Sequence, residues 1–142
     1  MNVKIAASKE EREDAYSVRT KVFIDEQNVP EEEEIDRFED ESTHFVLYDD
    51  SHSPIGAGRF RLLDGLGKVE RICVLSSARQ NGAGAAIMEA IHDFAASKGI
   101  KKFKLNAQVH AIPFYEKLGY EAISDEFLDA GIPHKTMVKE TE

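Results

Sequence analysis

The sequence of 142 residues has a single cysteine, no long apolar run and no excess of positive charge. One cysteine, Cys73, cannot form an internal disulfide, which agrees with a reducing compartment. No apolar run approaches the roughly 20 residues that span a bilayer, and the N-terminus lacks a signal-peptide pattern. We therefore expect a cytoplasmic protein without a membrane partner.

The net charge of the chain also indicates which kinds of partner it can bind. A formal net charge of -9 at pH 7 has the wrong sign for following a phosphate backbone, so we expect no nucleic-acid partner, and it suits a cationic acceptor better. The histidines show no spacing typical of a metal site, and we expect no metal. A hydrophobic fraction of 42% and a charged fraction of 32% predict one globular domain over residues 1–142. A homodimer is compatible with the sequence, which does not fix the oligomeric state.

Hydrophobic periodicity and turn residues predict the secondary structure. The predicted helices run from a Ser8–Glu11 capping box to a point before Pro30, over 83–98 and over 112–118. The predicted strands cover 3–6, 44–48, 55–63, 69–75, 102–107, 120–123 and 135–139. Because a helix lies between the strands over 69–75 and 102–107, we expect these two strands to be parallel.

A glycine-containing loop joins an apolar strand to the helix over 83–98, with the sequence Arg79-Gln80-Asn81-Gly82-Ala83-Gly84. Its glycines let backbone amides approach a ligand, the first helical turn adds unpaired N–H groups, and the arginine adds a planar cation. This composition predicts an anion site suited to a diphosphate. A glycine-rich turn that only caps the helix is the alternative. The loop has neither the G-x-G-x-x-G nor the G-K-[ST] spacing, which disfavours a nucleotide-binding module.

The loop resembles the R-x-x-G-x-G/A signature of the GNAT acetyltransferase superfamily. Residues 111–120 resemble that superfamily's A-x-x-F-Y-x-x-x-G-F/Y segment, and the likeness extends from the first strand to the strand that ends near Lys139. A finer resemblance, in residues 22–27, 43–45 and 131–134, is to a bacterial branch of predicted acyltransferases. The superfamily resemblance implies an α/β (α+β) fold, a mixed and mostly antiparallel sheet with a splayed parallel strand pair and helices on both faces.

The same resemblance implies an N-acyltransferase that moves an acetyl group from acetyl-CoA to a small-molecule or protein amine by direct transfer in a ternary complex. Amides of the splayed strand would bond the pantetheine arm and the thioester oxygen, and the loop would hold the pyrophosphate. The implied cofactor-binding residues are Ile72, Cys73, Val74, Arg79, Gln80, Asn81, Gly82, Ala83, Gly84, Ala85 and Gln108. Gln80 stands where the superfamily pattern commonly has glycine, and Gln108 stands where it often has asparagine. The alternative function is a non-catalytic acyl-CoA binding or sensing domain.

Tyr115 is the predicted general acid, since the superfamily places a tyrosine there to protonate the leaving thiolate; packing of its ring is the alternative. Glu70 is the leading candidate base. Strand alternation puts it on a face with Ile72 and Val74, where an apolar environment would raise its pKa. A glutamate paired with Arg71 or with a neighbouring strand is an equal alternative, and the proton can instead leave through water.

The finer resemblance supplies four predicted acceptor-site residues: Glu26, His44, Arg59 and His134. His134 stands out because a loop before a closing strand would face the acceptor. The acidic residues between positions 31 and 41 are expected to form a solvated face, with a lining of the acceptor cleft as the less favoured interpretation. Cys73 is expected to be an inert, buried thiol.

Overall fold

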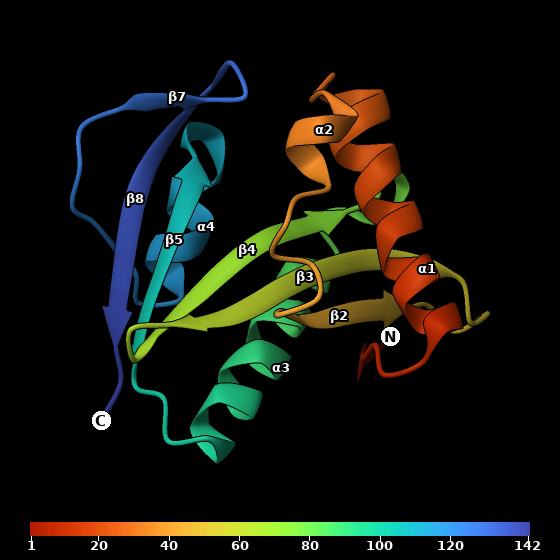
Figure 1. Ribbon diagram of the computed structural model, residues 1–142, viewed down its shortest axis with the longest axis horizontal. Helices are drawn as coiled ribbons and strands as arrows, with labels where there is room; N and C mark the ends of the chain where they lie inside the picture. Colours follow the sequence, from red (N-terminus) through yellow and green to blue (C-terminus); the bar gives the residue numbers. More distant parts are fainter.

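The computed structural model describes residues 1–142 and contains a mixed eight-stranded sheet (Figure 1). Its strands are β1 (Asn2–Ile5), β2 (Thr43–Tyr48), β3 (Pro54–Leu63), β4 (Leu66–Val74), β5 (Lys102–Gln108), β6 (Glu121–Ala122), β7 (Phe127–Asp129) and β8 (Ile132–Glu140). In space they follow the order β1-β2-β3-β4-β5-β8-β6, with β7 paired to β8. Every pair is antiparallel except β4 with β5, which confirms the predicted sheet.

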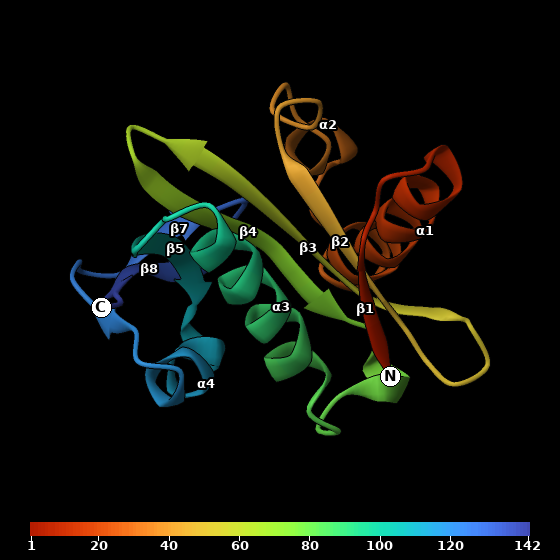
Figure 2. The ribbon, with the colours of Figure 1, turned by 90° about the horizontal axis from the view of Figure 1, so that it is seen from below.

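Helices cover both faces of this sheet. They are α1 (Lys9–Arg19), α2 (Glu31–Glu34), α3 (Ala83–Ser97) and α4 (Ile112–Lys117), with a π-helical segment η1 (Thr20–Glu26) and 3-10 turns η2 (Ser76–Ala78) and η3 (Val109–Ala111). The apolar stripe of α1 and η1, which includes Val18 and Val22, packs on one face, and Ile87 and Ile91 of α3 pack on the other. Figure 2 shows the sheet lying between α1 and α3. None of the helices combines the length and the apolar composition needed to cross a membrane.

The parallel pair β4 and β5 holds together at one end only. Their register consists of Gly67 opposite Phe103 and Lys68 opposite Lys104, and it stops there. Beyond Lys68 the two strands diverge, as Figure 1 shows, so the downstream half of β4 has no partner on its β5 side. The splayed strand pair expected from the sequence is therefore present.

β4 also contains a bulge at Arg71. The β3–β4 register shifts between Ala57 and Arg59, so that two residues of β4, Arg71 and Ile72, lie opposite Gly58 alone. Arg71 has a φ of 59°, in the left-handed region, which costs a non-glycine residue roughly 1 kcal/mol. Such strain persists only where the surrounding contacts hold it.

The bulge changes which side chains share a face of β4. Ile72 lies on the α3 side, because a Cβ added to Gly58 would come within 2.8 Å of it on the surface that α3 covers. Glu70 points to the opposite side, where it contacts Arg59 beneath α1. The prediction that Glu70 shares a face with Ile72 and Val74 is therefore wrong. Strict alternation fails where one strand carries an extra residue.

The chain closes with a hairpin that the sequence did not predict. Ala130 and Gly131 both have positive φ, 52° and 76°, which forms a two-residue turn between β7 and β8. Such turns are usually marked by Asn-Gly or Asp-Gly, so the signal here was weak. β8 consequently begins at Ile132, and His134 lies within the strand opposite Gln108 rather than in a preceding loop.

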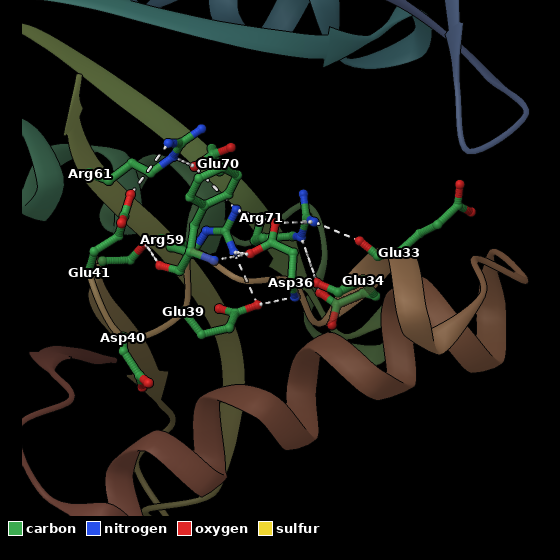
Figure 3. Close-up of polar contacts among 12 residues, drawn as sticks. Glu33, Glu34, Asp36, Glu39, Asp40, Glu41, Arg59, Arg61, Glu70 and Arg71 are labelled. Atoms are coloured by element: carbon green, nitrogen blue, oxygen red, sulfur yellow. Dashed lines mark hydrogen bonds and ion pairs between the residues drawn. The ribbon is translucent and has the colours of Figure 1, made fainter. Parts of the chain in front are cut away.

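Two arginines, Arg19 of α1 and Arg59 of β3, are fully buried between the sheet and the helical layer. Glu39 contacts both, at 2.8 Å from Arg19 Nη2 and 3.0 Å from Arg59 Nη1. Arg19 Nε donates a 2.8 Å hydrogen bond to Glu34, and Arg59 Nη1 donates one of 2.8 Å to Asp36. We call these five residues the charge cluster; Figure 3 labels all of them except Arg19.

The charge cluster corrects part of the expectation that the acidic run is a solvated face, because Glu31, Glu32, Glu33, Asp40 and Glu41 are exposed as expected but Glu34 and Glu39 are not. Glu34 and Glu39 are buried, because removing a guanidinium group from water costs several kcal/mol unless carboxylates compensate it. Burial by itself raises the pKa of Glu39. The hydrogen bonds and charge of Arg19, together with Arg59, outweigh that effect and lower the pKa to about 2.

We expect Glu39→Gln to lose about 3 kcal/mol of stability at pH 7, because the buried guanidinium groups lose their charged partner. The folded-state pKa lies below the ordinary 4.5, so Glu39 stabilises the protein fully above pH 4.5 and progressively less as the pH falls towards 2. Chemical denaturation across that range should therefore give a shallower pH dependence for the variant. Glu41→Gln, an exposed neighbour, is the control and should change stability by less than about 0.5 kcal/mol. Equal losses in both variants would contradict this assignment.

Candidate active site

A cleft of about 770 Å³ opens where β4 and β5 diverge. Its walls come from the downstream half of β4, the start of α3, the end of β5, α4, η1, α2 and the β7–β8 hairpin. The cleft brings together most of the residues singled out in the sequence, namely Glu26, Glu70, Ile72, Cys73, Val74, Arg79, Gln80, Gly82, Ala83, Gly84, Ala85, Gln108, Tyr115 and His134. Segments from the two ends of the chain and from its middle thus form one site.

The loop before α3 presents open backbone donors at the cleft. Gln80 and Gly82 have φ values of 68° and 78°, and Gly82 caps α3 without any side-chain hydrogen bond. The amides of the first turn of α3 therefore remain available to an anion. The left-handed backbone at Gln80 also explains why glycine is common at this position of the signature. Asn81 is exposed and does not line the cleft, so its place in the predicted set stays a prediction that rests on its backbone amide.

Arg79 already has a carboxylate partner. Its two terminal nitrogens each lie 2.8 Å from an oxygen of Glu26, and its Nε donates a 3.0 Å hydrogen bond to the Val74 carbonyl. The hydrogen bond from Arg79 lowers the pKa of Glu26. Both side chains are about 40% exposed, so water weakens this pair. A phosphate group that binds Arg79 would have to share the guanidinium group with Glu26 or displace Glu26 from it.

Tyr115 presents a buried phenol in the cleft. Its side chain packs against Phe114 and Tyr120, and its hydroxyl makes no hydrogen bond within the protein. Burial raises the pKa of Tyr115 above its ordinary value, so the hydroxyl keeps its proton at neutral pH. Cys73 is buried nearby, and burial raises the pKa of its thiol to about 12, which makes it a poor nucleophile.

Two glutamines bridge the cleft. Gln108 Nε2 donates a 2.8 Å hydrogen bond to Gln27 Oε1, and the reverse contact measures 3.4 Å. Gln27 follows η1 and was not predicted, because a polar residue after a helix gives no sign of a distant partner. His134, directly opposite Gln108 in the β5–β8 register, donates a 2.6 Å hydrogen bond from Nδ1 to the Ile132 carbonyl.

Two predicted acceptor-site residues do not reach the cleft. Arg59 belongs to the charge cluster and has no exposed surface. His44 is buried on β2, where its Nε2 donates a 2.8 Å hydrogen bond to the Glu39 carbonyl, and burial lowers its pKa. These two expectations are wrong, because the charge of Arg59 and the ring of His44 are used inside the fold.

Glu70 does line the cleft, but its carboxylate is occupied. Arg61 Nε donates a 2.7 Å hydrogen bond to its Oε1, and Arg59 Nη2 lies 3.2 Å away. This arrangement matches the alternative in which the glutamate pairs with a neighbouring strand. Lys68 and Arg71 also line the cleft, and no motif in the sequence marks either of them as a site residue.

Comparison with known proteins identifies the family of the chain. The family described as "Acetyltransferase (GNAT) domain" matches residues 6–141. The chain belongs to the GNAT acetyltransferase family. It is 55% identical to the uncharacterized N-acetyltransferase YjcF of Bacillus subtilis (strain 168), over 99% of this chain and 100% of the relative.

Solved structures agree with this membership. An acyl-CoA N-acyltransferase from Pseudomonas aeruginosa superposes with a TM-score of 0.84 at 25% identity, covering 97% of each chain. An aminoglycoside 6'-N-acetyltransferase complexed with coenzyme A superposes with a TM-score of 0.76 at 16% identity, covering 99% of this chain and 97% of the other. The second likeness shows the fold alone.

Because Glu26 competes for Arg79, we expect Glu26→Gln to bind CoA about threefold more tightly than the unmodified protein. An exposed ion pair is worth at most about 1 kcal/mol, which sets this modest size. Isothermal titration with CoA measures the change, and Asp25→Asn, one residue earlier in η1, is the control for general charge. Weaker CoA binding by the Glu26→Gln variant would mean that Glu26 orients Arg79 instead of competing with the phosphate.

Proposed function

We propose that the protein is an N-acetyltransferase that transfers an acetyl group directly from acetyl-CoA to an amine within a ternary complex. One observation carries the proposal: the open N-terminus of α3, the unpaired half of β4 and the Tyr115 hydroxyl all border one cleft. The coenzyme A in the aminoglycoside acetyltransferase structure supports a CoA-type donor. Gln80 to Ala85 would hold the pyrophosphate through backbone amides.

The downstream half of β4 supplies the donors for the acyl end. Residues Ile72 to Val74 have no strand partner on the β5 side, so their N–H groups there are available to the pantetheine arm and the thioester oxygen. Donors fixed in the backbone stabilise the negative charge that develops on that oxygen, usually a large part of catalysis. The Arg71 bulge changes the course of the strand immediately before these residues.

The transfer itself needs a nucleophile, a departing thiolate and two proton movements. The neutral amine attacks the thioester carbon, the carbon–sulfur bond breaks, and the Tyr115 hydroxyl gives its proton to the thiolate. Two arginines hold Glu70, so we propose that the proton lost by the amine leaves through water in the cleft. Tyr115 recovers its proton from solvent.

The alternative function is a non-catalytic acyl-CoA binding or sensing domain. Incubation of the protein with acetyl-CoA and a panel of amines, with release of free thiol as the readout, separates the two functions. We expect amine-dependent thiol release. Tight CoA binding without thiol release on any amine would favour the binding domain.

Tyr115→Phe should lower turnover by roughly ten- to a thousand-fold and leave CoA affinity nearly unchanged, since the ring stays and only the proton donor is lost. The loss should shrink for acyl donors whose leaving thiol is more acidic. Tyr120→Phe is a matched control, because it removes another buried phenol, one that bonds His92 outside the cleft. Unchanged turnover in the Tyr115→Phe variant would assign the acid role to water or to another residue.

A further inference from the structure

Arg71 directs an unpaired donor into the cleft. Its Nε donates to the Glu34 carbonyl at 3.2 Å, and its Nη2 donates to the Glu33 carbonyl at 3.1 Å and to Asp36 at 3.3 Å. Nη1 makes no hydrogen bond within the protein, and Figure 3 shows one terminal nitrogen pointing away from these acceptors. The side chain is 23% exposed and lines the cleft. The guanidinium group is therefore fixed, with one edge open to a ligand.

Lys68 adds a second cation to the same wall. It lies two positions before Glu70 on β4, so its side chain points to the same face as Glu70 and Arg71. The ammonium group is partly buried and makes no hydrogen bond or ion pair within 4 Å. Burial lowers the pKa of Lys68; the charge of Glu70 acts against this shift, and the charge of Lys104 adds to it. A cation in this position gains from any anion that enters the cleft.

Arg71 pairs with Glu34 and Asp36 through Nε and Nη2, which leaves its Nη1 as the free edge, and Lys68 beside it has no ion pair. The protein as a whole has a net charge of -9. The cleft contains one other arginine, Arg79, and it forms an ion pair with Glu26. In the charge cluster both arginines are neutralised by carboxylates. Carboxylates are abundant in this chain, yet none pairs with Arg71 Nη1 or Lys68. These two groups therefore form a position in the cleft where an anion can bind.

We propose that the acceptor is a small amine that also carries a carboxylate, with the carboxylate bound between Arg71 Nη1 and Lys68. This inference rests on the proposed acetyl transfer and names its substrate class. Arg71 directly precedes Ile72, where the thioester would bind, so a carboxylate on Arg71 places a neighbouring amine close to the acyl carbon. An α-amino acid has its two groups at that short separation.

The charges around the site favour a carboxylate over a phosphate and over a polyamine. Glu33 and Asp129 line the same cleft, so a dianionic phosphate would be repelled, whereas the amine of a zwitterion would be attracted. A polyamine has no anionic group that could bind Arg71 Nη1 or Lys68, and it would place positive charge beside both. A compact monoanion with an adjacent amine satisfies both sets of charges.

The test compares the standard L-amino acids with their C-terminal amides, polyamines and phosphate-bearing amines as acceptors of acetyl-CoA. We expect kcat/KM to favour amino acids over the matching amides by at least about tenfold, the size of a charge-assisted hydrogen bond. Titration calorimetry should show the same preference for N-acetyl amino acids over N-acetyl amino acid amides, independently of turnover.

Variants assign the preference to the two cations. Arg71→Gln should raise KM for the amino acid about 10- to 100-fold while KM for the amide changes less than about threefold. Arg71 also holds α2, so Lys68→Gln, which removes no internal contact, is the second variant and should reduce the preference several-fold. Lys102→Gln, exposed on β5 and outside the cleft, is the control and should leave the preference unchanged.

Each other outcome overturns the inference. Amides or polyamines acetylated as well as amino acids would overturn the carboxylate site and leave acetyl transfer intact. A preference for phosphate-bearing amines would assign the cations to phosphate instead. A preference for amino acids that survives in both variants would place the carboxylate elsewhere. A protein that binds acetyl-CoA but transfers to no amine would overturn the proposed function and this inference with it.

Discussion

Burial of two guanidinium groups beneath α1 is the constraint on which the acceptor side of the cleft depends. Arg19 and Arg59 have no exposed surface, so carboxylates have to follow them into the interior. The acidic segment supplies Glu34 and Glu39, and pairing them draws α2 down onto the sheet. The carbonyls at the end of α2 then hold Arg71. Electrostatic compensation in the core therefore sets the shape of a surface site.

The second constraint is the geometry of β4. Its pairing with β5 ends at Lys68, which opens the cleft, and its bulge at Arg71 puts two consecutive side chains on one face. Without the extra residue, alternation would direct Arg71 towards α3, and Glu70 and Arg71 could not both reach the α1 side. The splay and the bulge act within a few residues of each other, so donor binding and acceptor binding share one strand.

The signals that correctly predicted which residues line the cleft are local ones. The loop from Arg79 to Gly84 and the tyrosine of α4 could be predicted to lie in one site because glycine, helix-start and motif patterns are written in a few adjacent residues. The position of Arg19 in its helix is a further local signal, which the predictions did not include. Arg19 lies four residues after Ala15 and three before Val22, on the buried stripe of its helix, so the sequence already implied a buried charge that needed partners.

The sequence by itself determined the family, the order of the elements, the parallel strand pair and the loop at the start of α3, because periodicity and glycine positions act over short distances. Only the tertiary structure decided which charges would be buried and which would face the cleft. The partners of Arg19 are 15 and 20 residues away, and those of Arg71 more than 30. Whether a charge is neutralised depends on such distant contacts, and one inserted residue in β4 changed the face on which Glu70 lies.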